Sequence, residues 1–284
     1  MTAGETNKRP KIFYGWYILG IGMMGVVMAA GTSQLFMSIM LKPLTAEFGW
    51  SRTAATGAIT TGTLVAGIVS ILFGRLADRY GPRLLTAMGA VVTAGVYLAI
   101  TRLTELWHLY VVYIIGRVVA SNTMSKVVPN TAVVNWFRRM RGRALGLLAM
   151  ASPLGSSVLA IVGQYIIERH GWRSVFHVYA VAILALVAVP AAVMLRRRPE
   201  DMGLLPDGRP RQGTATASKN YPAEEKEYSW KLKEAMGTPA LWLIISAIVV
   251  ALSVNTGIGF HCRVCLSLSH AGAGPWPHCG IHFL

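Results

Sequence analysis

Arg117 and Lys126 are the two basic residues inside a long apolar stretch, residues 106–128. If this stretch crosses a lipid bilayer, a cation within it is costly and is expected to face a cavity or an oppositely charged partner. Arg117 could therefore bind an organic anion such as a carboxylate, and Lys126 could provide a second positive site. The alternative for Arg117 is a structural ion pair with Asp78 or Glu168. The alternative for Lys126 is a long side chain whose ammonium group reaches the membrane surface.

Two uncharged polar residues also interrupt apolar stretches. Gln34 lies in the first stretch, residues 15–40, and Asn255 lies in the last, residues 239–260. Polar side chains in membrane helices often only form hydrogen bonds between helices, but they can also line a cavity. The candidate substrate-binding residues are therefore Arg117, Lys126, Gln34 and Asn255.

Residues 74–83, with the sequence GRLADRYGPR, connect two apolar stretches and hold one acid among three arginines. Gly74 would let the preceding helix end against a neighbour, Gly81 suits a tight turn, and Pro82 presets φ for the first turn of the next helix. Asp78 is available to pair with a basic residue or with a helix N-terminus. An ordinary basic connection on the cytoplasmic side of a membrane is the alternative interpretation.

The elements that carry these residues are predicted to be membrane spans. The chain has 284 residues, of which 54% are hydrophobic and 14% are charged, whereas a soluble domain carries roughly 25% charged residues. Apolar residues gather in stretches long enough for helices that cross a bilayer, which need about 20 residues each. A helix is favoured in lipid because it satisfies its own backbone hydrogen bonds. The predicted spans are residues 15–40, 53–74, 84–101, 106–128, 143–167, 173–195 and 239–260.

The formal net charge of +15 is compatible with either nucleic acid or the inner face of a membrane as a partner. The basic residues lie between the apolar stretches and not along one polar face, which argues against nucleic acid. Most of the 27 Lys and Arg residues fall on one side if the N-terminus is cytoplasmic, as the positive-inside rule favours. We therefore expect a multi-pass protein of the cell membrane, an inner membrane, with its N-terminus in the cytoplasm.

The opposite ends of the spans carry tryptophans. Trp50, Trp107 and Trp172 each lie where a helix re-enters the membrane, and an indole prefers this interface. Residues 49–52 and 171–174 read GWSR and GWRS, which hints at related three-helix units. Ser51 would cap the second helix, and small residues would permit close helix approach. These small residues are Gly57, Gly62 and Gly67 in the second span, and Gly142 and Gly146 at the start of the fifth.

The predicted domain organisation follows from the order of apolar and polar stretches. Residues 1–13 form a cytoplasmic tail, residues 14–195 a six-helix transmembrane bundle, residues 196–238 a cytoplasmic linker, and residues 239–261 a seventh transmembrane helix. The linker is rich in Pro, Gly, Thr and charged residues and has no sustained apolar period.

Residues 74–83 closely resemble the loop signature of the major facilitator superfamily. Residues 13–16, 135–146 and 199–208 resemble bacterial transporters of the monocarboxylate/oxalate–formate type, so that the resemblance covers about residues 12–261. It implies an all-α membrane protein with the six-helix N-terminal half of the major facilitator fold plus one further transmembrane helix. It also implies that Gly74, Asp78, Arg79, Gly81 and Arg83 form a conformational latch, and that an arginine at position 117 serves substrate binding or proton coupling.

The last 23 residues, 262–284, depart from the resemblance. All three cysteines lie there, at positions 262, 265 and 279. Cys-x2-Cys followed by His and Cys could indicate zinc, but the spacing fits no standard finger and we predict no metal site. We interpret this aberrant tail as the product of a frameshift or truncation.

The function that the resemblance implies is secondary active transport of a small organic anion, such as a monocarboxylate, by alternating access, with a proton as a coupling ion. No catalytic constellation or nucleotide-binding loop is visible, so neither an enzyme nor a cofactor is predicted. Transporters of this type bind substrate between two six-helix halves, and we expect these 284 residues not to transport by themselves. The alternative is a non-transporting membrane protein, either a defective gene product or a half that assembles with a separately encoded partner.

Overall fold

The computed structural model describes residues 13–196, 234, 236–251 and 253–254. The chain divides into two compact units, Met1–Thr214 and Ala215–Leu284. Every regular element among the described residues is a helix, which confirms the all-α prediction. In the second unit the structure describes one apolar helix, Pro239–Ala251. Asn255, most of the linker and the tail 262–284 lie outside the described residues.

The first unit contains five helical segments that are long and apolar enough to cross a membrane. They are built from α1 (Gly15–Ala29) with η1 (Ala30–Thr32), α3 (Arg52–Ile100), α4 (Leu106–Ala120) with η2 (Ser121–Ser125) and α5 (Val127–Trp136), α6 (Arg141–His170), and α7 (Trp172–Ile183) with η3 (Leu184–Ala188) and α8 (Val189–Met194). A further helix, α2 (Gln34–Phe48), follows η1.

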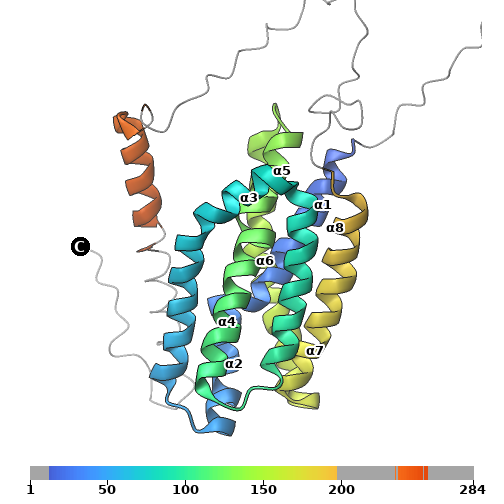
Figure 1. Cartoon of the computed structure of the whole chain (residues 1–284), viewed down its shortest axis with the longest axis vertical. Helices are drawn as coiled ribbons and strands as arrows, with labels where there is room; N and C mark the ends of the chain where they lie inside the picture. Colours follow the sequence, from blue (N-terminus) through green and yellow to red (C-terminus); the bar gives the residue numbers. More distant parts are fainter. Residues whose placement is uncertain (1–12, 197–233, 235, 252, 255–284) are drawn as a thin grey trace, which may run out of the picture. The chain divides into compact units, whose positions relative to one another are not determined.

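Two predicted spans lie within α3. The backbone of Gly81 is not helical, with φ 79° and ψ 165°, and Figure 1 shows the parts of α3 before and after it running in opposite directions. This backbone conformation is open almost only to glycine, and the helix resumes at Pro82. The tight turn predicted at Gly81 is therefore confirmed. Gly171, between α6 and α7, has nearly the same conformation, with φ 79° and ψ 164°.

The first predicted span, residues 15–40, is not one continuous helix, and this prediction was wrong. The helical path stops after Thr32, and Ser33 is extended with ψ 157°. The Ser33 hydroxyl then accepts a hydrogen bond from the backbone N–H of Phe36, 3.3 Å away, so that it caps the new helix α2. Hydropathy does not detect this break because the residues on both sides are apolar.

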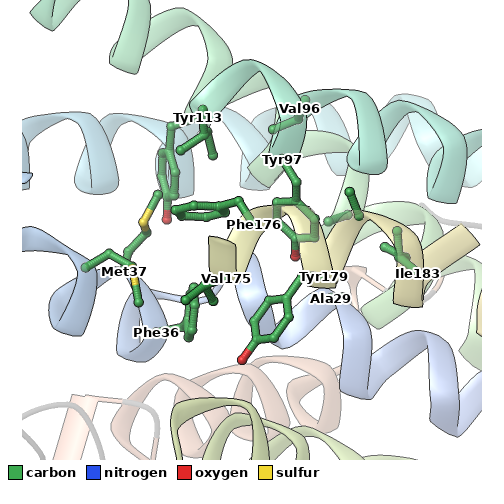
Figure 2. Close-up of a cluster of buried hydrophobic side chains, with 14 of the residues drawn as sticks. Ala29, Phe36, Met37, Val96, Tyr97, Tyr113, Val175, Phe176, Tyr179 and Ile183 are labelled. Atoms are coloured by element: carbon green, nitrogen blue, oxygen red, sulfur yellow. The ribbon is translucent and has the colours of Figure 1, made fainter. Parts of the chain in front are cut away.

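Aromatic side chains fill the centre of the bundle (Figure 2). Phe176 packs edge-on against Phe36, with ring centroids 6.2 Å apart, and lies 5.9 Å from Tyr97. Tyr179 lies 5.4 Å from Phe36 and donates a hydrogen bond to the carbonyl of Leu159. This core joins α2, α3, α6 and α7.

The outer surface of the bundle is apolar. Ile68, Ile71 and Ile161 are each more than 70% exposed. Apolar patches of this kind are rare on soluble monomers, whereas a bilayer covers them without cost. The exposed side chains and the five long apolar helices agree with a multi-pass membrane protein.

The two ends of the bundle differ in chemistry. We call residues 47–52, 100–108 and 169–177 the tryptophan end, and residues 75–83 and 136–143 the arginine end. Ser51 caps α3 at the tryptophan end, as predicted, by accepting a hydrogen bond from the N–H of Ala54 at 3.2 Å. Trp172 was expected at the lipid interface, but its side chain is buried in the bundle. Its indole N–H donates to the Glu47 carboxylate at 2.6 Å.

Candidate functional site

Arg117 lies in the last turn of α4, next to the face that packs on α3. The two helices approach closely because Gly62 of α3 has no side chain. A β-carbon at position 62 would lie 2.9 Å from Cε1 of Tyr113 and 3.5 Å from Cβ of Arg117. The contact predicted for Gly62 is thus present, and it brings the base of the Arg117 side chain against the first half of α3.

The Nε atom of Arg117 is buried and has no hydrogen-bond partner among the described residues. Neither of the predicted acidic partners forms an ion pair with Arg117 within this part of the chain: Glu168 is exposed and accepts a hydrogen bond from Gln164, and Asp78 is exposed beside the Gly81 turn. A buried donor without an acceptor typically costs about 1–3 kcal/mol, and more when it is charged. Arg117 is therefore a cation positioned to receive an acceptor.

The buried hydroxyl and amide groups around Arg117, in contrast, have partners. Thr123 donates to the carbonyl of Val119 at 2.8 Å, and Asn122 donates to the carbonyls of Val118 and Ala66 at 2.8 and 3.3 Å. Buried polar groups normally find such partners. The exceptions to this pattern among the described residues are the Nε atoms of Arg117, within the fourth predicted span, and of Arg141, at the arginine end.

The break in the first span lies close to Arg117 through Tyr113, which precedes Arg117 by one helical turn. The Tyr113 hydroxyl donates to the carbonyl of Thr32 at 3.1 Å, and the Tyr97 hydroxyl donates to the carbonyl of Met28 at 3.2 Å. Carbonyls that a broken helix frees need such donors. Gln34 is the first residue of α2, immediately after the break, although its side chain is outside the described atoms.

Lys126 lies at the end of the π-helical turn η2, with φ −115° and ψ −71°. Its side chain is exposed, whereas Ser121, Asn122, Thr123 and Met124 of η2 are buried. The structure thus places Lys126 on the surface and Arg117 in a half-buried position. Asn255, the fourth candidate residue, is outside the described residues.

Asn122 and Tyr113 were not predicted as site residues, although they connect α4 and η2 to α3 and to the break in the first span. The sequence could have indicated a polar contact at Asn122, since this residue is an amide in an apolar stretch, five residues after Arg117. The hydrogen bond of the Tyr113 hydroxyl could not be predicted, because a tyrosine in a span is equally typical of core packing.

Residues 74–83 form the end of the first half of α3 and the turn at Gly81. Asp78, Arg79 and Arg83 are exposed there, and the Arg79 guanidinium lies 5.5 Å from the ring centroid of Tyr80. The interpretation of Gly74 was wrong: the helix continues past it to Tyr80, and a β-carbon at Gly74 would meet no described atom within 4 Å.

Comparison with known proteins gives a consistent result. Residues 19–267 match the Major Facilitator Superfamily. Monocarboxylate transporter 3 of Mus musculus is 31% identical over 176 residues, which cover 60% of this chain and 34% of that protein. Riboflavin transporter RibZ of Clostridioides difficile is 24% identical over 164 residues, covering 57% and 35%. The chain spans about a third of the length of these curated relatives.

A solved structure supports the fold. The proton:xylose symporter XylE, bound to 6-bromo-6-deoxy-D-glucose, aligns with a TM-score of 0.54 over 63% of this chain and 45% of that chain, at 16% identity. An alignment at this identity is evidence for the fold alone. The match to the family covers most of the sequence, and the relatives of the chain named above are transporters and not enzymes. This chain therefore belongs to the Major Facilitator Superfamily.

Proposed function

We propose that the protein serves secondary active transport of a small organic anion, of the monocarboxylate class, across the cell membrane. The observation that carries this proposal is the buried Nε atom of Arg117, which has no hydrogen-bond partner among the described residues. A guanidinium binds a carboxylate through paired, charge-assisted hydrogen bonds. Because Arg117 lies within a predicted membrane span, its charge favours an anion over a neutral solute.

The relatives support the class of activity and leave several solutes open. One is named a monocarboxylate transporter and another a riboflavin transporter, and the structural neighbour is named a proton:xylose symporter. The monocarboxylate is preferred here because the cation of Arg117 complements one negative charge. A proton is the proposed coupling ion, by analogy with the symporter alone.

The remaining candidate residues have proposed roles around Arg117. Gln34 starts α2 directly after the break in the first span, which is the type of discontinuous helix that often forms substrate sites in transporters. Lys126, exposed at the end of η2, is proposed as a second positive site that a substrate meets before or after Arg117. Asn255 is proposed to contribute from the seventh helix.

The orientation and the loop role are proposals of the same kind. The arginine end is proposed to face the cytoplasm together with the N-terminus, because basic connections are retained on that side. The turn at Gly81, with Gly74, Asp78, Arg79 and Arg83 on the helix and connection beside it, is proposed as the conformational latch. The turn at Gly81, where the chain reverses direction, would transmit motion between the second and third spans.

Ligand-induced thermal stabilisation tests the anion site. The chain in lipid nanodiscs would be heated with small monocarboxylates and, in parallel, with the corresponding neutral amides. We expect stabilisation by the acids only, and a loss of about tenfold to hundredfold in apparent affinity for Arg117→Gln, the ratio for a charged hydrogen bond of about 1.5–3 kcal/mol. Arg169→Gln is the matched control, since Arg169 is exposed at the end of α6. Equal stabilisation by the amides, or an unchanged Arg117→Gln variant, would contradict the proposal.

Transport itself is proposed to need a second bundle, because substrate in this family type is held between two halves. We therefore expect no saturable uptake of labelled monocarboxylates into proteoliposomes that contain only these 284 residues. Saturable uptake that disappears with Arg117→Gln would show that this expectation is wrong while supporting the anion site.

A further inference from the structure

A hollow of about 510 Å³ lies at the tryptophan end of the first unit, away from Arg117. Its walls come from the end of α3 and from α4 and α7, which flank the second half of α3. Val96 of α3 packs on Gly116 of α4, and the guanidinium of Arg173, the second residue of α7, donates to the carbonyl of Thr101 at 3.2 Å. The lining includes Ala99, Arg102, His108 and His177.

The rim of this hollow is basic. Arg102 is exposed, and its side chain has no ion pair among the described residues. His177 uses Nδ1 to donate to the carbonyl of Arg173 at 2.9 Å, so that Nε2 of the neutral ring is an acceptor. His108 also lines the hollow, and its Nδ1 lies 3.2 Å from the hydroxyl of Thr104; when Nδ1 accepts from that hydroxyl, Nε2 is a donor. Arg102 and His108 can therefore donate hydrogen bonds to the phosphate of an anionic headgroup.

Neither nearby acid forms an ion pair with Arg102 among the described residues. The carboxylate of Glu47 binds Arg173 at 2.7 Å, and the carboxylate of Glu105 accepts a hydrogen bond from the indole of Trp107. An indole is a neutral donor, so only Glu47 has a cationic partner. Arg102 is left as the cation that lines the hollow.

The hollow borders an exposed apolar strip of α3. Ala99 lines the hollow, and Gly95, one turn earlier, is exposed, so that a β-carbon built there meets no described atom within 4 Å. Val91, a further turn away, is 55% exposed, and Val181 on the same side of α7 as His177 is 67% exposed. The hollow thus lies beside the apolar surface that the bilayer covers.

We propose that this hollow and the exposed apolar strip beside it bind one phospholipid with an anionic headgroup. The phosphate contacts Arg102 and His108, and an acyl chain lies over Ala99 and Gly95. A cationic rim at the end of a helix bundle and an apolar surface beside it match the two halves of such a lipid. Trp107, which is 59% exposed and precedes His108, places this rim at the depth of the headgroups. The proposal does not depend on the anion site at Arg117.

Native mass spectrometry of the full 284-residue chain in detergent tests the proposal, with phosphatidylglycerol as the probe and phosphatidylcholine of the same acyl chains for comparison. We expect one phosphatidylglycerol to be retained at least about tenfold more tightly than phosphatidylcholine, and Arg102→Gln to weaken its binding by about tenfold. Arg169→Gln, at the same end but on α6, is expected to leave binding unchanged. Equal weakening by both substitutions would overturn the proposal, since general charge attraction would then explain the binding.

A second variant separates a lipid from free phosphate. Gly95→Phe places a ring on the exposed apolar strip without changing the residues of the rim, and we expect it to weaken the binding of phosphatidylglycerol by about tenfold. The control Gly142→Phe, at an equally open glycine of the arginine end, is expected to have no effect. Unchanged binding in Gly95→Phe, or full displacement of the lipid by inorganic phosphate, would overturn the lipid assignment in favour of a headgroup-only anion site. Circular dichroism of each variant checks that it is folded.

Discussion

The two ends of the bundle hold their helices together by different means. At the tryptophan end, Arg173 pairs with Glu47 at 2.7 Å and donates to the carbonyl of Thr101 at 3.2 Å, and Trp172 donates to Glu47 at 2.6 Å. The Arg173 guanidinium also lies 4.5 Å from the ring centroid of Trp172. A few directional polar contacts thus join α2, α3 and α7.

At the arginine end, aromatic packing joins the helices. Trp136 is 0% exposed, and its ring lies 5.5 Å from that of Tyr14 and 6.1 Å from that of Phe13. The Tyr14 hydroxyl donates to the carbonyl of Met194 at 2.6 Å, which ties α1 to α8. The comparison teaches that net charge does not reveal how the helices of an end are joined: fully buried aromatic side chains also connect the helices where arginine is most frequent.

The largest effect is expected for Trp136→Ala. Truncation of a fully buried aromatic side chain removes packing and leaves a cavity, which costs about 3–5 kcal/mol. The matched control is Trp107→Ala, because Trp107 is 59% exposed at the other end. Chemical unfolding in mixed micelles measures both changes. Equal losses of unfolding free energy in the two variants would contradict the view that buried aromatic packing stabilises the arginine end.

The next largest loss of stability is expected at the two glycine turns, and it should be the same at both ends. Gly81 and Gly171 share φ 79° and nearly the same ψ, so Gly81→Ala and Gly171→Ala should each cost about 1–3 kcal/mol through backbone strain. The unfolding free energies of the two variants would be measured side by side. Gly74→Ala, at a helical and uncrowded glycine, is the control and should be neutral or slightly stabilising. A loss at Gly74 as large as at Gly81 would show that strain is not the cause.

A smaller effect is expected for the ion pair, because Glu47 and Arg173 are 40% and 45% exposed and solvent weakens exposed pairs. Arg173→Gln should destabilise the bundle more than Glu47→Gln, since it also removes the donor to Thr101, whereas a glutamine at position 47 keeps an oxygen that can accept from Trp172. In a double-mutant cycle the two losses should be less than additive. Removal of the exposed Arg79 at the arginine end is the comparison variant. Strict additivity of the Glu47 and Arg173 substitutions would mean that the pair does not couple α2 to α7.

The smallest effect is a dependence on pH at the tryptophan end. Hydrogen bonds from Arg173 and from Trp172 hold the pKa of the Glu47 carboxyl below its usual value. The stabilisation is therefore complete above the unfolded-state pKa, about 4.3, and is lost as the pH falls through the lower pKa of the folded state. The unfolding midpoints of the wild type and of Glu47→Gln should converge below about pH 4. A constant difference at all pH values would contradict this assignment.

Much of the fold could be predicted from local composition. The ends of α6, at Arg141 and His170, and of the helical run Trp172–Met194 lie within a few residues of the predicted boundaries, and the turn at Gly81 follows from a glycine before a proline. Among the glycines predicted to permit close contacts, Gly57 and Gly62 meet tyrosines of α4, whereas Gly67 meets no described atom within 4 Å. A glycine permits close approach, but the neighbouring helix decides whether it happens.

The candidate site was predicted in part. The position of Arg117 in a span could be predicted because its charge contrasts with its neighbours. The lack of a partner for its Nε atom could not, because any of several acids could have reached it. The contact of Asn122 with the carbonyl of Ala66, 56 residues away, likewise depends on how α3 packs on η2.

By itself the sequence determined that this chain crosses membranes with apolar helices, that arginines gather at the connections of one end, and that a cation lies within the fourth span. These properties follow from the transfer free energies of consecutive residues, which are local. Only the tertiary structure decided where the first span breaks, which acid binds Arg173, and whether Arg117 has a partner. Those outcomes depend on the distances between helices. The side chains of both helices together determine these distances, because they pack against one another.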